Sequence, residues 1–174
     1  MKPDFVYHFS EDPLIKIFRP HIPTTRTDAE PLVWAIDEAH APLYWFPRDC
    51  PRITFWIGPE TPPEAKARFF GHTSATRVHA IESVWLDRIK QTKLYAYRLS
   101  SDTFEPYGEA DGHWVSRQEV VPLAIEPVGD LLARHAEAGI ELRVTPSLWP
   151  LHDAIPNSGL RFSMVRMRNA LPRP

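Results

Sequence analysis

The residues that decide the fold run from Val33 to Ile57 and read VWAIDEAHAPLYWFPRDCPRITFWI. Both ends of this stretch are apolar and rich in β-branched and aromatic residues, which favours β-strands over 32–36 and 53–57. The connection between them is aromatic and is closed by Pro47 and Pro51, so it is predicted to form one short helical or irregular turn. Two buried strands joined in this way can frame a pocket, although composition alone assigns no reaction to it.

The rest of the chain reads as short strands and short helices. Further strands are expected at 5–9, 77–81, 93–99, 113–116 and 140–144, helices at 64–70, 82–91 and 127–138, and a short helix or turn at 148–155. Many short strands with few, short helices indicate an α+β fold around a strongly bent antiparallel or mixed sheet.

A length of 174 residues predicts a single domain covering 1–174. Trp34, Phe55 and Leu94 are each central to an apolar strand, so we expect them to share one core. Thr61 is expected to cap the helix that follows it, because Pro62 suits the first helical position and Glu64 suits a capping box.

Charge and hydropathy exclude several classes of partner. The 20 basic and 22 acidic residues give a net charge of −2, so the chain has no general attraction to nucleic acid or to an anionic membrane. No run approaches the roughly 18 apolar residues of a membrane span, and the first residues lack the apolar core of a signal peptide. We therefore expect a cytoplasmic protein with a small-molecule or nucleotide ligand, and the sequence leaves its oligomeric state open.

Several kinds of reaction centre lack their usual sequence patterns. The eight histidines and the single cysteine form none of the common metal-binding spacings, so no metal is expected. Glycine-rich phosphate cradles and a Gly-x-Ser-x-Gly elbow are absent, so no bound cofactor is expected. Arg48 and Arg52 would lower the pKa of Cys50 and Asp49 would oppose them, but a lone thiol among aromatic residues is typical of a small buried hydrophobe.

Three residues remain as candidates for chemistry. His8 lies on the first strand in Tyr-His-Phe-Ser, Tyr44 follows the second strand, and Glu119 follows a late strand. The motifs around them, YHFSEDP, YWFPRDCPR, WVSR and PVGDL, resemble an uncharacterised bacterial domain family over nearly the whole chain. That resemblance implies no established activity.

A second, more distant resemblance does imply an activity. The order of a histidine on strand one, a tyrosine after strand two and a late glutamate is similar to the ADP-ribosyltransferase fold. This resemblance implies that His8 holds a ribose hydroxyl, that Tyr44 stacks on nicotinamide, and that Glu119 stabilises an oxocarbenium-like transition state, with NAD as substrate. The chain departs from that superfamily in having no Ser-Thr-Ser strand motif and no clear Gln-x-Glu around Glu119.

The surroundings of these residues predict ligand contacts and leave two functions open. Ser10, Trp45, Arg48 and Arg52 are the expected ligand-binding residues, the arginines because a planar fork suits phosphate or carboxylate. The alternative for the arginines is pairing with internal carboxylates. The protein is then either a nucleotide-handling transferase or hydrolase, or a non-catalytic domain that binds a ligand or peptide in an aromatic, arginine-lined cleft.

Overall fold

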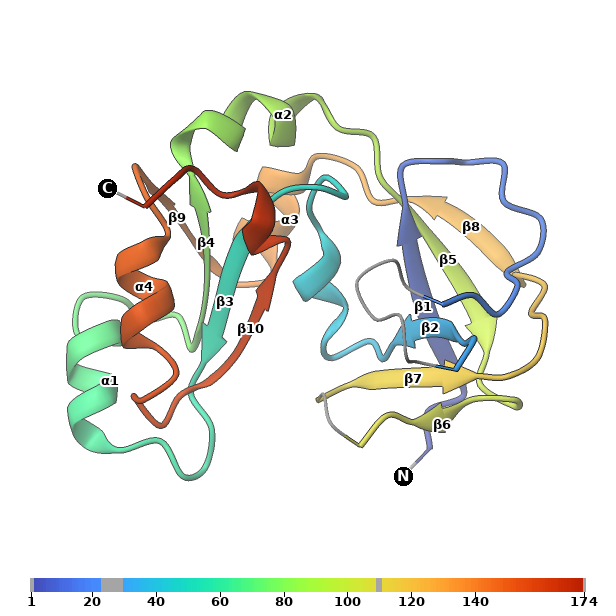
Figure 1. The fold of residues 1–174 in the computed structure, drawn as a ribbon, viewed down its shortest axis with the longest axis horizontal. Helices are drawn as coiled ribbons and strands as arrows, with labels where there is room; N and C mark the ends of the chain where they lie inside the picture. Colours follow the sequence, from blue (N-terminus) through green and yellow to red (C-terminus); the bar gives the residue numbers. More distant parts are fainter. Residues whose placement is uncertain (1, 23–29, 109–110, 174) are drawn as a thin grey trace. The chain divides into compact units, whose positions relative to one another are not determined.

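The computed structural model describes residues 2–22, 30–108 and 111–173. The chain forms two compact units, each built from two separate segments. Unit 1 takes residues 1–45 and 93–128, and unit 2 takes residues 46–92 and 129–174 (Figure 1). The single-domain organisation expected from length stays a prediction.

Unit 1 holds a six-stranded antiparallel sheet. Its strands are β1 (Phe5–Ser10), β2 (Val33–Ile36), β5 (Tyr95–Ser100), β6 (Glu105–Pro106), β7 (His113–Ser116) and β8 (Ala124–Pro127). They lie in the order β6-β7-β2-β1-β5-β8, and the 3₁₀ helix η1 (Ala41–Tyr44) follows β2. The core of this unit packs around β1 and β5, and it includes Val6, Phe18, Val33, Tyr97, Leu99 and Phe104.

The central strand of this sheet is paired unevenly. β1 pairs with β5 along its whole length, from Phe5 opposite Ser100 to Ser10 opposite Tyr95. With β2 it shares one registered pair, Tyr7 opposite Ile36. β1 and β2 therefore part after this pair, at the level of His8.

Unit 2 holds a four-stranded mixed sheet. Its strands are β3 (Arg52–Trp56), β4 (Arg77–Glu82), β9 (Glu141–Thr145) and β10 (Arg161–Val165), in the order β10-β3-β4-β9. Its helices are α1 (Pro63–Phe70), η2 (Ser83–Trp85), α2 (Leu86–Gln91), α3 (Leu131–Glu137), α4 (Trp149–Ala154) and η3 (Met167–Asn169). β4 and β9 run parallel, whereas β3 pairs antiparallel with both β4 and β10.

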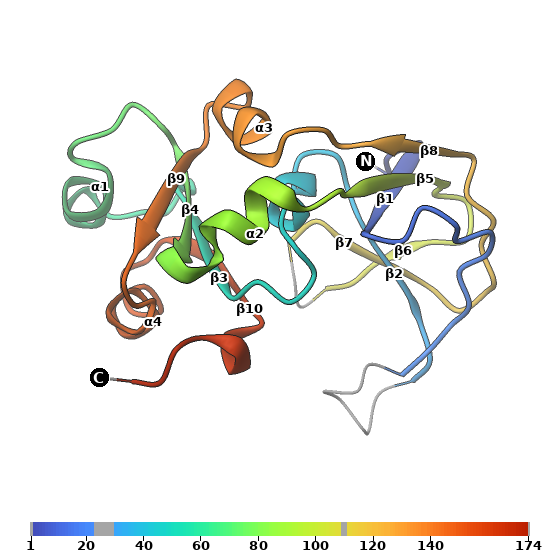
Figure 2. The same ribbon diagram turned by 90° about the horizontal axis from the view of Figure 1, so that it is seen from above.

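Helices cover both faces of this second sheet (Figure 2). On one face, α1 and α4 pack against an apolar set of strand residues, namely Ile53, Phe55, Val78 and Ala80. On the other face, α3 places His135 against His79 of β4. Phe46 packs on both of these rings.

The α+β class is confirmed, and its strands divide between an antiparallel sheet and a mixed one. Two local expectations are wrong. Thr61 does not cap α1, because its hydroxyl accepts from the Gly58 N–H and donates to the Gly159 carbonyl. Trp34 and Phe55 do not share a core, because they belong to different units.

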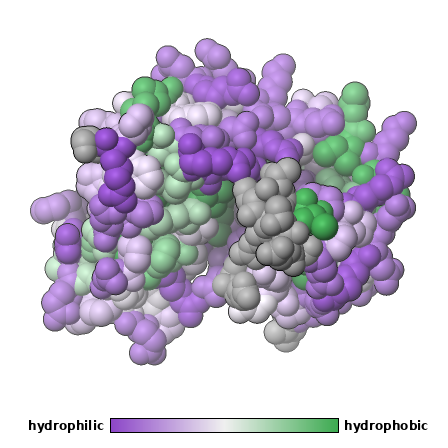
Figure 3. Space-filling model, viewed as in Figure 1, coloured by the Kyte–Doolittle hydropathy of each residue, from purple (hydrophilic) through white to green (hydrophobic). Residues whose placement is uncertain are grey.

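The surface is mostly hydrophilic on the face that Figure 3 shows, and apolar side chains gather there only in small areas. Among the helices that the structure describes, none is long and apolar enough to cross a membrane.

Candidate functional site

Tyr44 and His113 form a hydrogen-bonded pair in unit 1. The Tyr44 hydroxyl lies 2.7 Å from Nε2 of His113, and Nδ1 of His113 lies 3.0 Å from the Asp111 carbonyl oxygen. Because a carbonyl oxygen only accepts, Nδ1 carries the proton and Nε2 accepts from Tyr44. A tyrosine hydroxyl bonded to a histidine that a third group orients is an arrangement suited to ligand binding or proton transfer.

The local fold brings the two residues together from distant parts of the chain. β7 pairs with β2 so that His113 lies opposite Ile36, the last residue of β2. The chain then turns at Asp37, whose carboxylate accepts from the backbone N–H of His40 at 2.9 Å, and enters η1, which ends at Tyr44.

Gly112 completes this turn. Its carbonyl accepts from the Asp37 N–H at 2.9 Å, and its φ of +73° is left-handed. A Cβ at this position would meet the His40 ring at 2.3 Å, so only glycine fits.

Trp34 on β2 contacts the His113 ring of this pair. Its ring centroid lies 4.7 Å from that of Tyr107 and 6.4 Å from that of His113, both with edge-on geometry. Its indole N–H is buried and has no hydrogen-bond partner among the described residues. An unsatisfied buried donor costs about 1–3 kcal/mol, and an acceptor supplied by a ligand would recover that cost. We call Trp34, Tyr44, Tyr107 and His113 the Trp34 cluster.

His8 is attached to this cluster through the backbone of Trp34. Its Nδ1 donates to the Trp34 carbonyl oxygen at 2.9 Å, at the level where β1 and β2 part. The other side of its ring packs on Phe18, with the centroids 4.7 Å apart. The imidazole therefore bridges two strands that the sheet ladder does not join at this point.

Glu119 lies in another part of unit 1, beside Phe18. Its carboxylate accepts from Nε of Arg19 at 2.9 Å, and both side chains are more than half exposed. The next residue, Val120, pairs with Phe18 through two backbone hydrogen bonds. Phe18 thus contacts His8 through its ring, and its backbone pairs with the residue next to Glu119. A series of contacts therefore runs from Glu119 through Phe18 to His8, and from His8 through Trp34 and His113 to Tyr44.

The expected ligand-binding residues are placed differently. The Ser10 hydroxyl accepts from the Asp12 N–H at 3.1 Å, and Trp45 is buried. Arg52 is only 3% exposed; its Nη1 donates to the Cys50 carbonyl oxygen, and its guanidinium lies over the Phe46 ring. Arg52 is therefore not presented to a solvent anion, whereas the exposed Arg48, also in unit 2, keeps that role as a prediction.

Cys50 is fully buried, as the sequence indicated. Burial raises the pKa of its thiol to about 12, and the nearby Arg52 opposes this effect only in part. A thiol with so high a pKa is neutral at physiological pH, so it is not a nucleophile in the folded protein.

No sequence pattern singles out His113. It lies 69 residues from Tyr44, and no motif joins the two. Only the pairing of β7 with β2 reveals the contact. Across the described ranges, no group of three or more His, Cys, Asp or Glu side chains is arranged to hold a metal ion.

The geometry defines an α+β protein with an aromatic and histidine-containing cluster on its six-stranded sheet. The chain belongs to a family of unknown function, DUF6886, whose family model matches residues 7–170 and so includes every residue of this cluster. No curated protein and no solved structure matches the chain.

Proposed function

We propose that the protein handles a nucleotide of the NAD or ADP-ribose type at the Trp34 cluster, in the manner of the ADP-ribosyltransferases, and that it does so in the cytoplasm. One observation carries this proposal: Trp34 links the two residues expected to contact the nucleotide, His8 directly and Tyr44 through His113. Its carbonyl oxygen accepts from His8, and its indole ring packs edge-on against His113, which accepts from Tyr44.

The cluster suits a planar heterocycle that carries a hydrogen-bond acceptor. The bond to His113 restrains the Tyr44 ring, which reduces the side-chain freedom lost when a heterocycle stacks on it. The buried N–H of Trp34 is a donor for a carboxamide oxygen. These two features support nicotinamide as the group bound.

His8 and Glu119 would then act on the sugar. His8 holds a ribose hydroxyl, and the Glu119 carboxylate stabilises the positive charge that develops as the bond from the sugar C1′ to nicotinamide breaks. Nicotinamide leaves with the bonding electron pair, and an acceptor nucleophile takes its place on C1′. The exposed pair between Glu119 and Arg19 does not prevent this, because exposed ion pairs contribute about 0–1 kcal/mol.

A non-catalytic ligand-binding or peptide-binding domain is the second candidate. The observation that favours it is that the Glu119 carboxylate already has a partner in Arg19. In that function the Trp34 cluster binds a ring and no bond is broken.

Titration calorimetry with NAD and ADP-ribose, together with an assay of nicotinamide release, separates these functions. If the protein is a transferase, Glu119→Gln abolishes nicotinamide release and leaves ligand binding nearly unchanged, because the charge acts in the transition state. Glu105→Gln is the matched control, since Glu105 also pairs with an exposed arginine of unit 1, Arg117. If the parent protein binds one of these ligands but releases no nicotinamide, the second candidate function is assigned. If neither NAD nor ADP-ribose binds, the proposal is overturned.

A further inference from the structure

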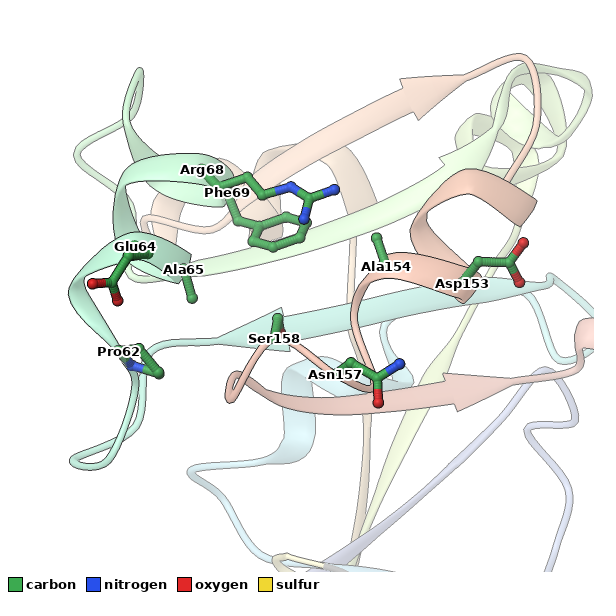
Figure 4. Close-up of a pocket in the computed structure, with 9 residues that line it drawn as sticks. All are labelled: Pro62, Glu64, Ala65, Arg68, Phe69, Asp153, Ala154, Asn157 and Ser158. Atoms are coloured by element: carbon green, nitrogen blue, oxygen red, sulfur yellow. The ribbon is translucent and has the colours of Figure 1, made fainter.

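A separate hollow lies in unit 2, between α1 and α4, and has a volume of about 370 Å³ (Figure 4). It shares no residue with the Trp34 cluster, since its walls come from two other segments of the chain, namely Pro62, Glu64, Ala65, Arg68 and Phe69 in the first and Asp153, Ala154, Asn157 and Ser158 in the second. Much of the lining is apolar, with Phe69 and Ala65 on one side and Ala154 on the other. This volume is at the small end of the range for ligand-binding clefts.

Arg68 brings a positive charge into this hollow from the last turn of α1. Its guanidinium carbon lies 5.0 Å from the centre of the Phe69 ring, and its N–H groups point toward α4 (Figure 4). No hydrogen bond or ion pair joins this guanidinium to another described residue. A planar fork of N–H donors beside an aromatic ring is suited to a carboxylate attached to an apolar group.

The acidic residues of the hollow do not neutralise Arg68. Both oxygens of Asp153 accept from the Arg173 guanidinium, at 2.8 and 2.9 Å. That guanidinium, together with the bond to His152, holds the pKa of the Asp153 carboxyl well below its usual range, so Asp153 is ionised and already paired. The Glu64 carboxylate points away from the hollow (Figure 4).

The charges also limit the ligand to one negative group. A single arginine is available to neutralise it, and Glu64 at the rim would repel a second anionic group. Polyphosphates are therefore disfavoured. The Asn157 amide at the edge of the hollow offers a further donor for an uncharged polar group.

We propose that this hollow binds a small monocarboxylic acid whose apolar body is about the size of one aromatic ring. The carboxylate takes the Arg68 fork, and the body packs on Phe69 between Ala65 and Ala154. This is a second binding site, independent of the nucleotide function proposed for unit 1.

Phenylacetate is the probe for this site, and protein-detected NMR titration of the full chain measures its binding. We expect saturable shifts at residues of the hollow, with affinity reduced about tenfold or more in Arg68→Gln, because the charge-assisted bonds are lost. Lys66→Gln removes a charge from α1 outside the hollow and is expected to change the affinity by less than about twofold. Equal affinities in the parent and Arg68→Gln, or no saturable binding, overturn the proposal.

Further titrations, with other ligands and with a variant of the hollow, test which chemical features of the ligand are recognised. Phenylacetamide is expected to bind about tenfold more weakly than phenylacetate, since it lacks the charge, and Ala154→Phe is expected to block both by filling the hollow. Circular dichroism checks that this variant is folded; Ala154→Leu serves if it is not. A Gly-Gly-Phe peptide with a free carboxylate that binds about tenfold more tightly than phenylacetate overturns the small-molecule assignment in favour of a peptide C-terminus.

Discussion

Nε2 of His135 lies 3.0 Å from Nδ1 of His79, in the buried layer between α3 and β4. Nδ1 of His135 is 2.6 Å from the Leu131 carbonyl oxygen and therefore donates its proton there. His135 Nε2 must then accept from His79 Nδ1, so both rings are neutral. Nε2 of His79 is left as a buried acceptor without a partner among the described residues.

This pair predicts that the protein loses stability in mild acid. Burial, then the neighbouring His135, Arg77 and Arg52, lowers the pKa of His79, and burial also lowers the pKa of His135. The unfolded chain takes up these protons near pH 6.5, whereas the folded chain takes them up only at lower pH. The stability that the neutral pair contributes is therefore complete above pH 6.5, and the free energy of unfolding falls below it, by at most about 1.4 kcal/mol per pH unit for each histidine.

Urea unfolding at pH 7.5, 6.5 and 5.5 measures this slope. His79→Gln is expected to reduce the slope, because one of the two buried sites is gone. His21→Gln removes an exposed histidine and should leave the slope unchanged. A slope in His79→Gln equal to that of the parent would contradict the prediction.

Phe55 is expected to be essential to the core of unit 2. It is fully buried and packs edge-on against Phe69 and Phe70, so Phe55→Ala should lower the free energy of unfolding by about 3–5 kcal/mol. Phe162, directly opposite on β10 but 41% exposed, is the matched control, and truncating it should cost much less. Equal losses, measured by chemical denaturation, would show that the burial pattern of this sheet is wrong.

Gly112→Ala tests the turn that carries Tyr44. A Cβ there meets the His40 ring in addition to requiring a left-handed backbone, so we expect a loss of about 1–3 kcal/mol and weaker nucleotide binding. Gly129 also has a positive φ, but no atom lies within 4 Å of the position that a Cβ would take there. Gly129→Ala therefore measures backbone strain alone, and it should be the milder of the two substitutions in thermal unfolding.

Cys50 should resist alkylation in the folded protein. Its thiol is buried and its pKa is raised to about 12 by that burial, so little thiolate forms at pH 8. Iodoacetamide labelling followed by mass spectrometry is expected to be slow without denaturant and rapid in concentrated urea. Equally rapid labelling in both conditions would place the thiol at the surface.

The strands were predictable because their residue types reflect their local environment. Ile53 to Ile57 is β-branched and aromatic throughout, and it overlaps β3 (Arg52–Trp56), whose first four side chains are buried. The sequence predicts a helix over 127–138, which starts earlier than α3 does, because apolar residues at helical spacing begin before the residue that caps the helix. Asp130 accepts from the N–H groups of Leu132 and Ala133, and so α3 begins at Leu131.

The candidate site was only partly predictable. His8 and Tyr44 could be named from the sequence because each accompanies a recognisable strand pattern. The bond from Tyr44 to His113 depends on the order of strands within the sheet, which hydrophobic periodicity does not encode. For the same reason the sequence did not show that Trp34 and Phe55 belong to different units, since β2 and β3 are neighbours in the chain but not in a sheet.

The interleaved segments of the two units affect how the chain is made. When β3 and β4 leave the ribosome, both neighbours that complete their sheet, β9 and β10, are still to be translated. Likewise, β5 and β7, which flank β1 and β2 in the sheet, are translated after them. Neither sheet can be completed before most of the polypeptide exists. A deletion at the N-terminal end removes β1 and β2 from unit 1, and a deletion at the C-terminal end removes β9 and β10 from unit 2.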